Sequence, residues 1–193
     1  MTDLWQLPVT ASIGGREYPI HADFRDILEI FSYLQDPELP EALRWQIAMA
    51  LFYEGEISPE DWEEGCRIFV EFIDGVSKNC RKTVEKPSNP GPKLIDWQQD
   101  APVIVAEINR VAGQEIRALP FVHWWTFLAW FHAIGEGQLS TLVSVRDKLA
   151  RGKKLEGWEQ EYYRRNKRQV DLPKQYSKEE LAEQERLKAL LGS

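Results

Sequence analysis

The sequence predicts a mainly α-helical protein: a multi-helix domain that carries a small N-terminal β-hairpin. Apolar residues recur at intervals of three and four along most of the chain, the spacing of amphipathic helices. Alternation with a period of two is confined to the first twenty residues. A chain of 193 residues, 43% hydrophobic and 11% aromatic, can bury a core of its own, and its two cysteines imply no disulfide framework.

The hairpin is expected at the start of the chain. Residues 4–11 alternate in polarity like a strand, Gly14-Gly15 forms a tight turn, and a return strand covers Arg16 to Ile20. A hairpin of two strands is marginal alone, so it must lie on helices or pair with another chain.

Three helices complete a first segment, residues 1–77. Asp23 caps the first helix, Pro40 opens the second, and Ser58 to Asp61 supply a cap and a proline for the third. The expected apolar stripes are Phe24, Ile27, Leu28, Phe31 and Leu34; Ile47, Ala48, Leu51 and Phe52; and Trp62, Cys66, Phe69, Ile73 and Val76.

Residues 78–95 lose this periodicity and gain prolines and lysines, so an exposed linker is expected there. A second helical set, residues 96–172, starts at Asp96 or Asp100. Its helices are expected at a stripe of Ile104, Ile108 and Val111, at 122–134, at 139–149, and around Trp158, Tyr162 and Tyr163. Residues 173–193 are expected to form a charged C-terminal helix that a capping box opens at Ser177.

The formal net charge of −7 conceals a gradient along the chain. Up to Ser77 there are 16 acidic and 4 basic residues, a net charge of −12, whereas the remainder has a net charge of +5. Such an asymmetry favours head-to-tail association or docking of a charged partner.

The segment from His123 to His132 places three of the eight tryptophans in little more than two helical turns. A helix that is apolar all round must be covered on several sides, by its own domain or by a partner. Trp124, Phe127, Leu128 and Phe131 form the expected core stripe. The other faces, with Val122, Trp125 and Trp130, exceed what one small helical layer covers, so we expect them to accept an apolar helix of a partner.

No group of residues predicts catalysis, a metal site or a cofactor. His123 and His132 are nine residues apart and face opposite sides of one helix, and Cys66 and Cys80 lack zinc-site spacing. Acidic groups such as Asp96 and Asp100 lie at helix starts, where they satisfy free backbone amides. The protein is therefore expected not to be an enzyme.

The stretch from Tyr162 to Arg168 mixes aromatic rings with cations, which can suit nucleic-acid binding. Glutamates just before it indicate a solvated helix face instead. The favoured interpretation is that Trp158 and Tyr162 pack while the arginines meet an acidic partner. With no secretion signal and no run of about 20 apolar residues, we expect a cytoplasmic protein without a membrane partner.

Residues Tyr18 to Arg25 resemble the strand-into-helix signature of the bacteriophage gene-product-fifteen family, which occurs with tail morphogenesis proteins of long-tailed phages and prophages. The same order follows in Phe52-Tyr53, Phe69 to Ile73, a basic linker, Asp96, Asp100, His123-Trp124-Trp125, Phe127 and Arg146. The resemblance spans about Leu4 to Leu172. The chain departs from the family pattern at His21-Ala22, at Pro102 and from Ala112 to Ile116.

The resemblance implies a tail-assembly chaperone that coats the long helical tape measure protein in the host bacterial cytoplasm. Its partners would be the tape measure protein and other tail-assembly proteins, and a homo-oligomer fits the role. The alternatives are a structural tail component that stays in the particle and, less favoured, a nucleic-acid-binding protein. The expected partner-binding residues are Trp124, Trp125, Phe127, Trp130, Phe131, Trp158 and Tyr162.

Overall fold

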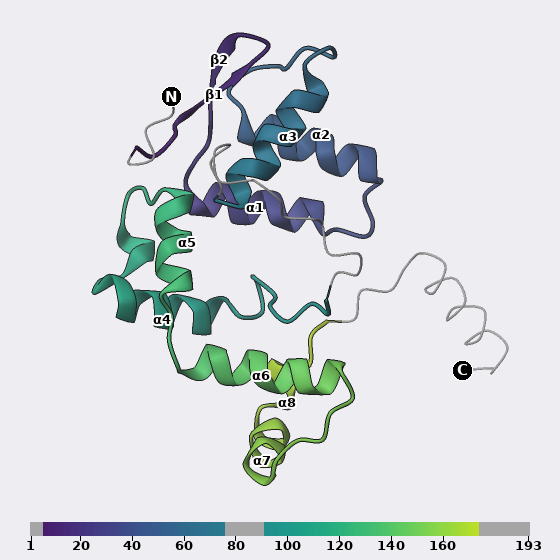
Figure 1. The fold of residues 1–193 in the computed structure, drawn as a ribbon, viewed down its shortest axis with the longest axis vertical. Helices are drawn as coiled ribbons and strands as arrows, with labels where there is room; N and C mark the ends of the chain where they lie inside the picture. The colour runs from purple at the N-terminus through teal and green to yellow at the C-terminus, as the bar shows by residue number, and fades with distance from the viewer. Residues whose placement is uncertain (1–5, 76–90, 174–193) are drawn as a thin grey trace, which may run out of the picture. The chain divides into compact units, whose positions relative to one another are not determined.

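The computed structural model describes residues 6–75 and 91–173, which are mainly α-helical with a small N-terminal hairpin (Figure 1). In chain order the elements are β1 (Thr10–Ile13), β2 (Arg16–Pro19), α1 (Phe24–Leu34), α2 (Glu41–Phe52), α3 (Trp62–Ile73), α4 (Ala101–Ala112), the 3-10 helix η1 (Ile116–Ala118), α5 (Trp124–His132), α6 (Gln138–Ala150), α7 (Gly157–Arg165) and α8 (Lys167–Val170). None of the helices in these two ranges is long and apolar enough to cross a membrane.

The described chain divides into two compact units. The N-terminal unit contains residues 9–21 and 25–69. The C-terminal unit contains residues 6–8, 22–24, 70–75 and 91–172. Residues 22–24 therefore pack with the second helical set, although the residues before and after them in sequence, 9–21 and 25–69, belong to the N-terminal unit.

The hairpin pairs β1 with β2 in antiparallel register, with Ala11 opposite Tyr18. Gly14 and Gly15 both have positive φ, 55° and 77°, the left-handed conformation that a two-residue hairpin turn needs. The expected first strand is present but its limits are wrong: residues 6–9 lie before it, and β1 begins at Thr10 and runs up to the turn, because that turn fixes the register. Residues 4 and 5 of the expected strand lie outside the described residues. The return strand also ends earlier, at Pro19.

The N-terminal unit packs the hairpin against α2 and α3. Ile20, expected in the return strand, instead forms an isolated bridge with Tyr53 at the end of α2. The buried hydroxyl of Tyr53 donates to the Gly65 carbonyl of α3 at 2.9 Å. The rings of Phe52 and Phe69 meet at 4.9 Å between the two helices. The hairpin is thus covered by helices of its own chain.

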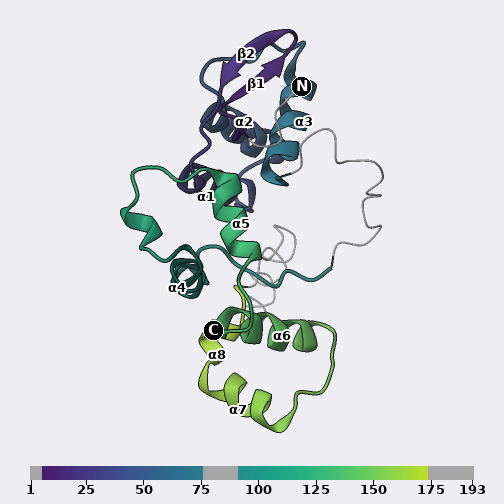
Figure 2. The ribbon, with the colours of Figure 1, turned by 60° about the vertical axis from the view of Figure 1, so that its left-hand side comes forward.

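The C-terminal unit is built on α4, α5 and α6, and α8 packs between α6 and α7 (Figure 2). Of the two expected starts for α4, Asp100 is the N-cap. Its carboxylate forms a bidentate ion pair with Arg146 of α6, at 2.6 and 2.9 Å. The Arg146 guanidinium also donates to the carbonyls of Leu94, Gln169 and Val170, which joins α4, α6 and α8.

Most helix boundaries agree with the sequence periodicity, and α5 is the main exception. It covers Trp124–His132 and not 122–134; at its start, Val122 is hydrogen-bonded to residues 23 and 24 and His123 is the N-cap. Most of the expected linker at 78–95 and nearly all of the C-terminal helix at 173–193 lie outside the described residues, as does Val76 of the third stripe.

Candidate functional site

The start of the tryptophan-rich helix α5 is held by residues 22–24. The Phe24 amide donates to the Val122 carbonyl at 2.9 Å, and the Trp124 amide donates to the Ala22 carbonyl at 2.7 Å. The Asp23 carboxylate accepts from the Val122 amide at 2.9 Å. Two segments almost a hundred residues apart therefore pair at the start of two helices, which no local pattern predicts.

His123 is the N-cap of α5 and is almost fully buried. Its Nδ1 accepts from the Trp125 amide at 3.0 Å, so Nε2 carries the proton and donates to the Pro8 carbonyl at 2.9 Å. Burial lowers the pKa of His123, because the charged ring would be cut off from water. Protonation of Nδ1 would also remove the atom that accepts from the Trp125 amide. The histidine acts as a neutral structural cap.

The rings of α5 divide into an interior set and a partly exposed set. Trp124 and Phe127 are each 1% exposed, and Phe127 stacks on Phe24 at 4.7 Å between ring centroids. Their role is therefore in the core. The expectation that Val122 faces a partner is wrong, because its pairing with residues 22–24 buries it.

Trp125, Trp130 and Phe131 keep part of their surface exposed. The indole of Trp125 donates to the Phe72 carbonyl at 2.8 Å, and that of Trp124 donates to the Ile73 carbonyl at 2.9 Å, so the last turn of α3 covers one side of the helix. Phe131 lies 5.2 Å from the ring of Trp97.

A row of rings connects this helix to the surface. Phe121, His123, Trp125 and Phe72 follow one another with centroid distances of 6.4, 5.8 and 5.8 Å. Phe121, which sequence reasoning missed, forms the outer end and is 53% exposed. Leu7, next to the Pro8 that binds His123, is also exposed. We call Phe72, Phe121, His123 and Trp125 the aromatic row.

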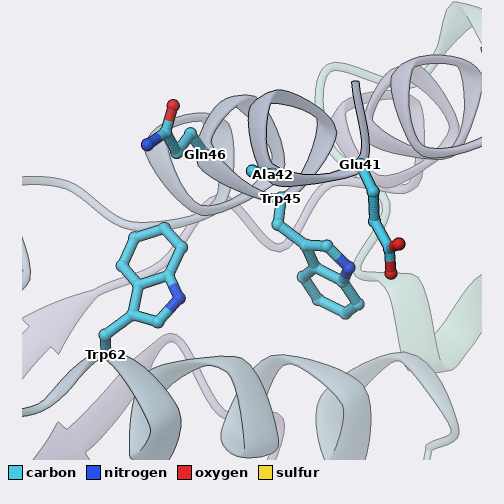
Figure 3. Close-up of a pocket in the computed structure, with 5 residues that line it drawn as sticks. All are labelled: Glu41, Ala42, Trp45, Gln46 and Trp62. Carbon is cyan, nitrogen blue, oxygen red and sulfur yellow. The ribbon is translucent and has the colours of Figure 1, made fainter. Parts of the chain in front are cut away.

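A second candidate surface lies on the N-terminal unit, where Trp45 of α2 and Trp62 of α3 lie on two sides of an open pocket (Figure 3). This pocket of about 420 Å³ shares Gln46 and Trp62 with a neighbouring pocket of about 520 Å³, and the two form one groove along α2. Met49, Tyr53 and Ile57 continue its apolar lining, and Glu41 and Glu56 add carboxylates. We call this the two-tryptophan groove.

Sequence reasoning assigned Trp62 to a core stripe and overlooked Trp45. Trp45 makes an edge contact with buried Phe69 at 6.2 Å yet stays partly exposed. The stretch 38–69 around the groove contains eight acidic and two basic residues. A tryptophan pair from two helices forms only once the helices pack, so periodicity within either helix does not show it.

The third surface is helix α7. Trp158 is 56% exposed, so the expectation that it packs is wrong. The next residue, Glu159, is the one that is buried, and its carboxylate pairs with Lys148 at 2.6 Å. Tyr162 and Tyr163 do pack, against a cluster of Leu142, Val145, Leu155 and Val170. Residues 148–168 contain eight basic and three acidic residues.

Within residues 6–75 and 91–173 no three His, Cys, Asp or Glu side chains come together as a metal site. Asp96 Oδ1 accepts from the amides of Gln98 and Gln99 in the turn before α4, as the expected role of the acidic residues requires. That role is wrong for the N-cap Asp100, whose carboxylate accepts from the Asp96 amide and from Arg146 and makes no side-chain capping bond to α4. What the described surface offers is a set of exposed rings with charged surroundings, which suits binding of polypeptide.

Comparison with known proteins places the chain in a family. The family described as Bacteriophage Gp15 protein matches residues 4–172, and so covers both helical sets. Neither the curated proteins nor the solved structures yielded a match. Arg146, which the resemblance in the sequence singled out, is the residue that holds Asp100. The chain belongs to the bacteriophage Gp15 protein family.

Proposed function

We propose that this phage protein is a non-enzymatic tail-assembly chaperone that binds the tape measure protein in the host bacterial cytoplasm. Membership of the bacteriophage Gp15 protein family supports a role in phage biology. The observation that favours a chaperone is the aromatic row, whose outer ring, Phe121, remains 53% exposed at the start of α5.

The physical basis of the proposal is the client's own apolar surface. A long amphipathic helix aggregates through its apolar stripe unless another surface covers it. Phe121 and Leu7 offer exposed apolar side chains, and the partly exposed Trp125 lies two contacts inward along the row. Trp130 and Phe131 extend the predicted client contact along α5. Many such contacts of moderate affinity would coat the client and still let it go.

The test is co-expression of the full chain with the tape measure protein of the same phage. The wild-type chain should keep that protein soluble and co-purify with it. Phe121→Ser should weaken the complex about tenfold, as expected for losing an apolar side chain from an interface. Leu149→Ser on α6 is the matched control, because Leu149 is an exposed apolar residue outside the aromatic row.

Unchanged solubility of the tape measure protein and no co-purification would refute the chaperone proposal. Mass spectrometry of purified phage particles addresses the alternative. A chaperone should be absent from the finished particle, whereas a structural tail component should be present in it.

A further inference from the structure

Two surfaces of this chain are complementary, and the aromatic row uses neither of them. The two-tryptophan groove of the N-terminal unit is open, apolar and surrounded by acidic residues. Helix α7 of the C-terminal unit carries an exposed tryptophan among basic residues. The groove is surrounded by acidic residues and α7 by basic residues, and the exposed indole of Trp158 on α7 is of a kind that the groove can bind.

The groove suits an indole side chain. Trp45 and Trp62 flank a pocket of about 420 Å³, inside the range of about 300–1,000 Å³ typical of ligand pockets. A ring placed between them would contact two indoles, and aromatic contacts stabilise beyond the area that they bury. Glu41 at one end and Glu56 at the other are both exposed, so cations beside the incoming ring can reach them.

Helix α7 supplies both features. Trp158 has more than half of its surface in water, and its indole donates to Glu156, two residues earlier, at 3.2 Å. Lys153 and Lys154 precede it, and Arg164 and Arg168 follow it, all exposed and without an ion pair in the described part of the chain. Residues 148–168 have a net charge of +5, against −6 for residues 38–69.

We propose that the two-tryptophan groove of one copy binds helix α7 of a second copy, with Trp158 between Trp45 and Trp62. The contact joins two different surfaces, so each bound copy keeps one groove or one α7 free for a further copy. The arrangement proposed is the open one, in which the second copy does not bind back to the first, so that association continues into chains or larger rings. The proposal concerns the protein alone and holds whatever its client is.

The test is the mass of the purified full chain over a series of concentrations, by sedimentation velocity and light scattering. The wild type should grow beyond a dimer as concentration rises. The growth should be strong at about 0.01 M salt and weak at about 1 M, where the Debye length falls from about 30 to about 3 Å. A monomer at every concentration in low salt would overturn the proposal.

Two variants separate the surfaces. Trp158→Ser removes the anchor, and Glu41→Lys/Glu56→Lys reverses charge at the groove. All three positions are exposed, so both variants should fold like the wild type by circular dichroism. Each should raise the dissociation constant about tenfold or more, as losing a central anchor does. The control Glu17→Lys/Glu29→Lys, which changes exposed acidic residues of the same unit outside the groove, should associate like the wild type.

Mixing the two variants is the decisive measurement. The groove variant keeps α7 and the Trp158→Ser variant keeps the groove, so an equimolar mixture should form dimers that stop growing. Adding Lys153→Glu/Lys154→Glu to the groove variant should restore its growth. A mixture that stays monomeric, or a wild type that stops at a dimer, would refute the head-to-tail contact.

Discussion

Arg146 shows how much one side chain can determine in this protein. Its guanidinium makes five hydrogen bonds, two to Asp100 and one each to the carbonyls of Leu94, Gln169 and Val170. Both partners of the ion pair are buried. Buried charges are tolerated only when all their hydrogen bonds are formed. The five bonds of Arg146 meet this condition, and they tie α6 to α8 and to the chain from Leu94 to Asp100.

Replacing Arg146 should therefore be costly. Arg146→Met leaves the Asp100 carboxylate buried without its cation and should lower the free energy of unfolding by about 3–5 kcal/mol, measured by urea denaturation. Arg151→Met is the control, since that arginine pairs with Asp147 at the surface and should cost no more than about 1 kcal/mol. Equal losses in the two variants would contradict the structural role of the buried pair.

His123 should make stability depend on pH. Burial lowers its pKa below the ordinary value of 6.5, so below that pH the unfolded chain binds a proton more readily than the folded protein. Stability should thus fall as the pH decreases from about 6.5 to about 5, by at most about 1.4 kcal/mol per pH unit. Denaturation midpoints across this range measure the effect.

His123→Asn keeps a side chain that can cap the helix and removes the titrating ring, so it should flatten this dependence. His132→Asn, at the exposed end of the same helix, should leave it intact. The carboxylates with lowered pKa values, such as Asp96 and Glu107, lose their stabilising effect only below about 4.5, outside the range. A steep dependence that persists in His123→Asn would contradict the assignment.

At the scale of elements, backbone conformation decides where helices end. Helix α4 stops at Gly113, whose φ of 70° lies in the left-handed region and whose amide donates to the Asn109 carbonyl. A Cβ there would meet no atom within 4 Å, so the preference for glycine is a matter of backbone conformation and not of space.

Gly113→Ala should lower the free energy of unfolding by about 1 kcal/mol, because alanine disfavours the left-handed conformation. Gly135→Ala is the matched control: a Cβ there also has open space, and φ is not in the left-handed region. Thermal unfolding of both variants measures the difference, and an equal shift of the two melting temperatures would argue against the backbone explanation.

Most elements could be predicted from the sequence because their determinants are local. Periodicity and capping residues located α1, α2, α3, α4 and α6, and paired glycines located the hairpin turn. The predicted boundaries were wrong where contacts with residues far away in sequence determine them. The start of α5 depends on residues 22–24, and the strand limits depend on the register that the turn imposes.

The candidate surfaces show the same division. The tryptophan-rich helix was recognised as a hub, yet its burial comes from Phe24 and from the last turn of α3. Those segments bury Trp124 and Phe127 of the expected core stripe, whereas Leu128 and Phe131 of the same stripe stay partly exposed. Trp45 and Trp62 lie on two helices, so their pairing across a groove appears only in three dimensions.

At the scale of the whole molecule, the C-terminal unit depends on a residue from the start of α1. Phe24 is buried against Phe127, and its amide pairs with Val122. Phe24→Ala should lower the free energy of unfolding by about 3–5 kcal/mol, the usual cost of removing a buried phenyl ring. Amide hydrogen exchange should accelerate at residues 122–127, far away in sequence.

Tyr18→Ala in the hairpin is the control for this effect, since that half-buried ring contacts Tyr53 within the N-terminal unit. It should leave exchange at residues 122–127 close to the wild-type rate. If Phe24→Ala changed only the amides around α1, the proposed dependence of the C-terminal unit on residues 22–24 would be wrong.

The pairing of residues 22–24 with 122–124 also imposes an order on synthesis. Asp23 leaves the ribosome 99 residues before its hydrogen-bond partner Val122. At about 5–20 residues per second, this interval lasts on the order of 5–20 seconds. In the later part of this interval the nascent chain holds every residue from 9 to 69, whereas the Phe127 ring on which Phe24 stacks has not yet left the ribosome. The pairing of these two segments is therefore timed by translation, and a truncated product that stops before residue 122 would lack the Phe127 ring that stacks on Phe24.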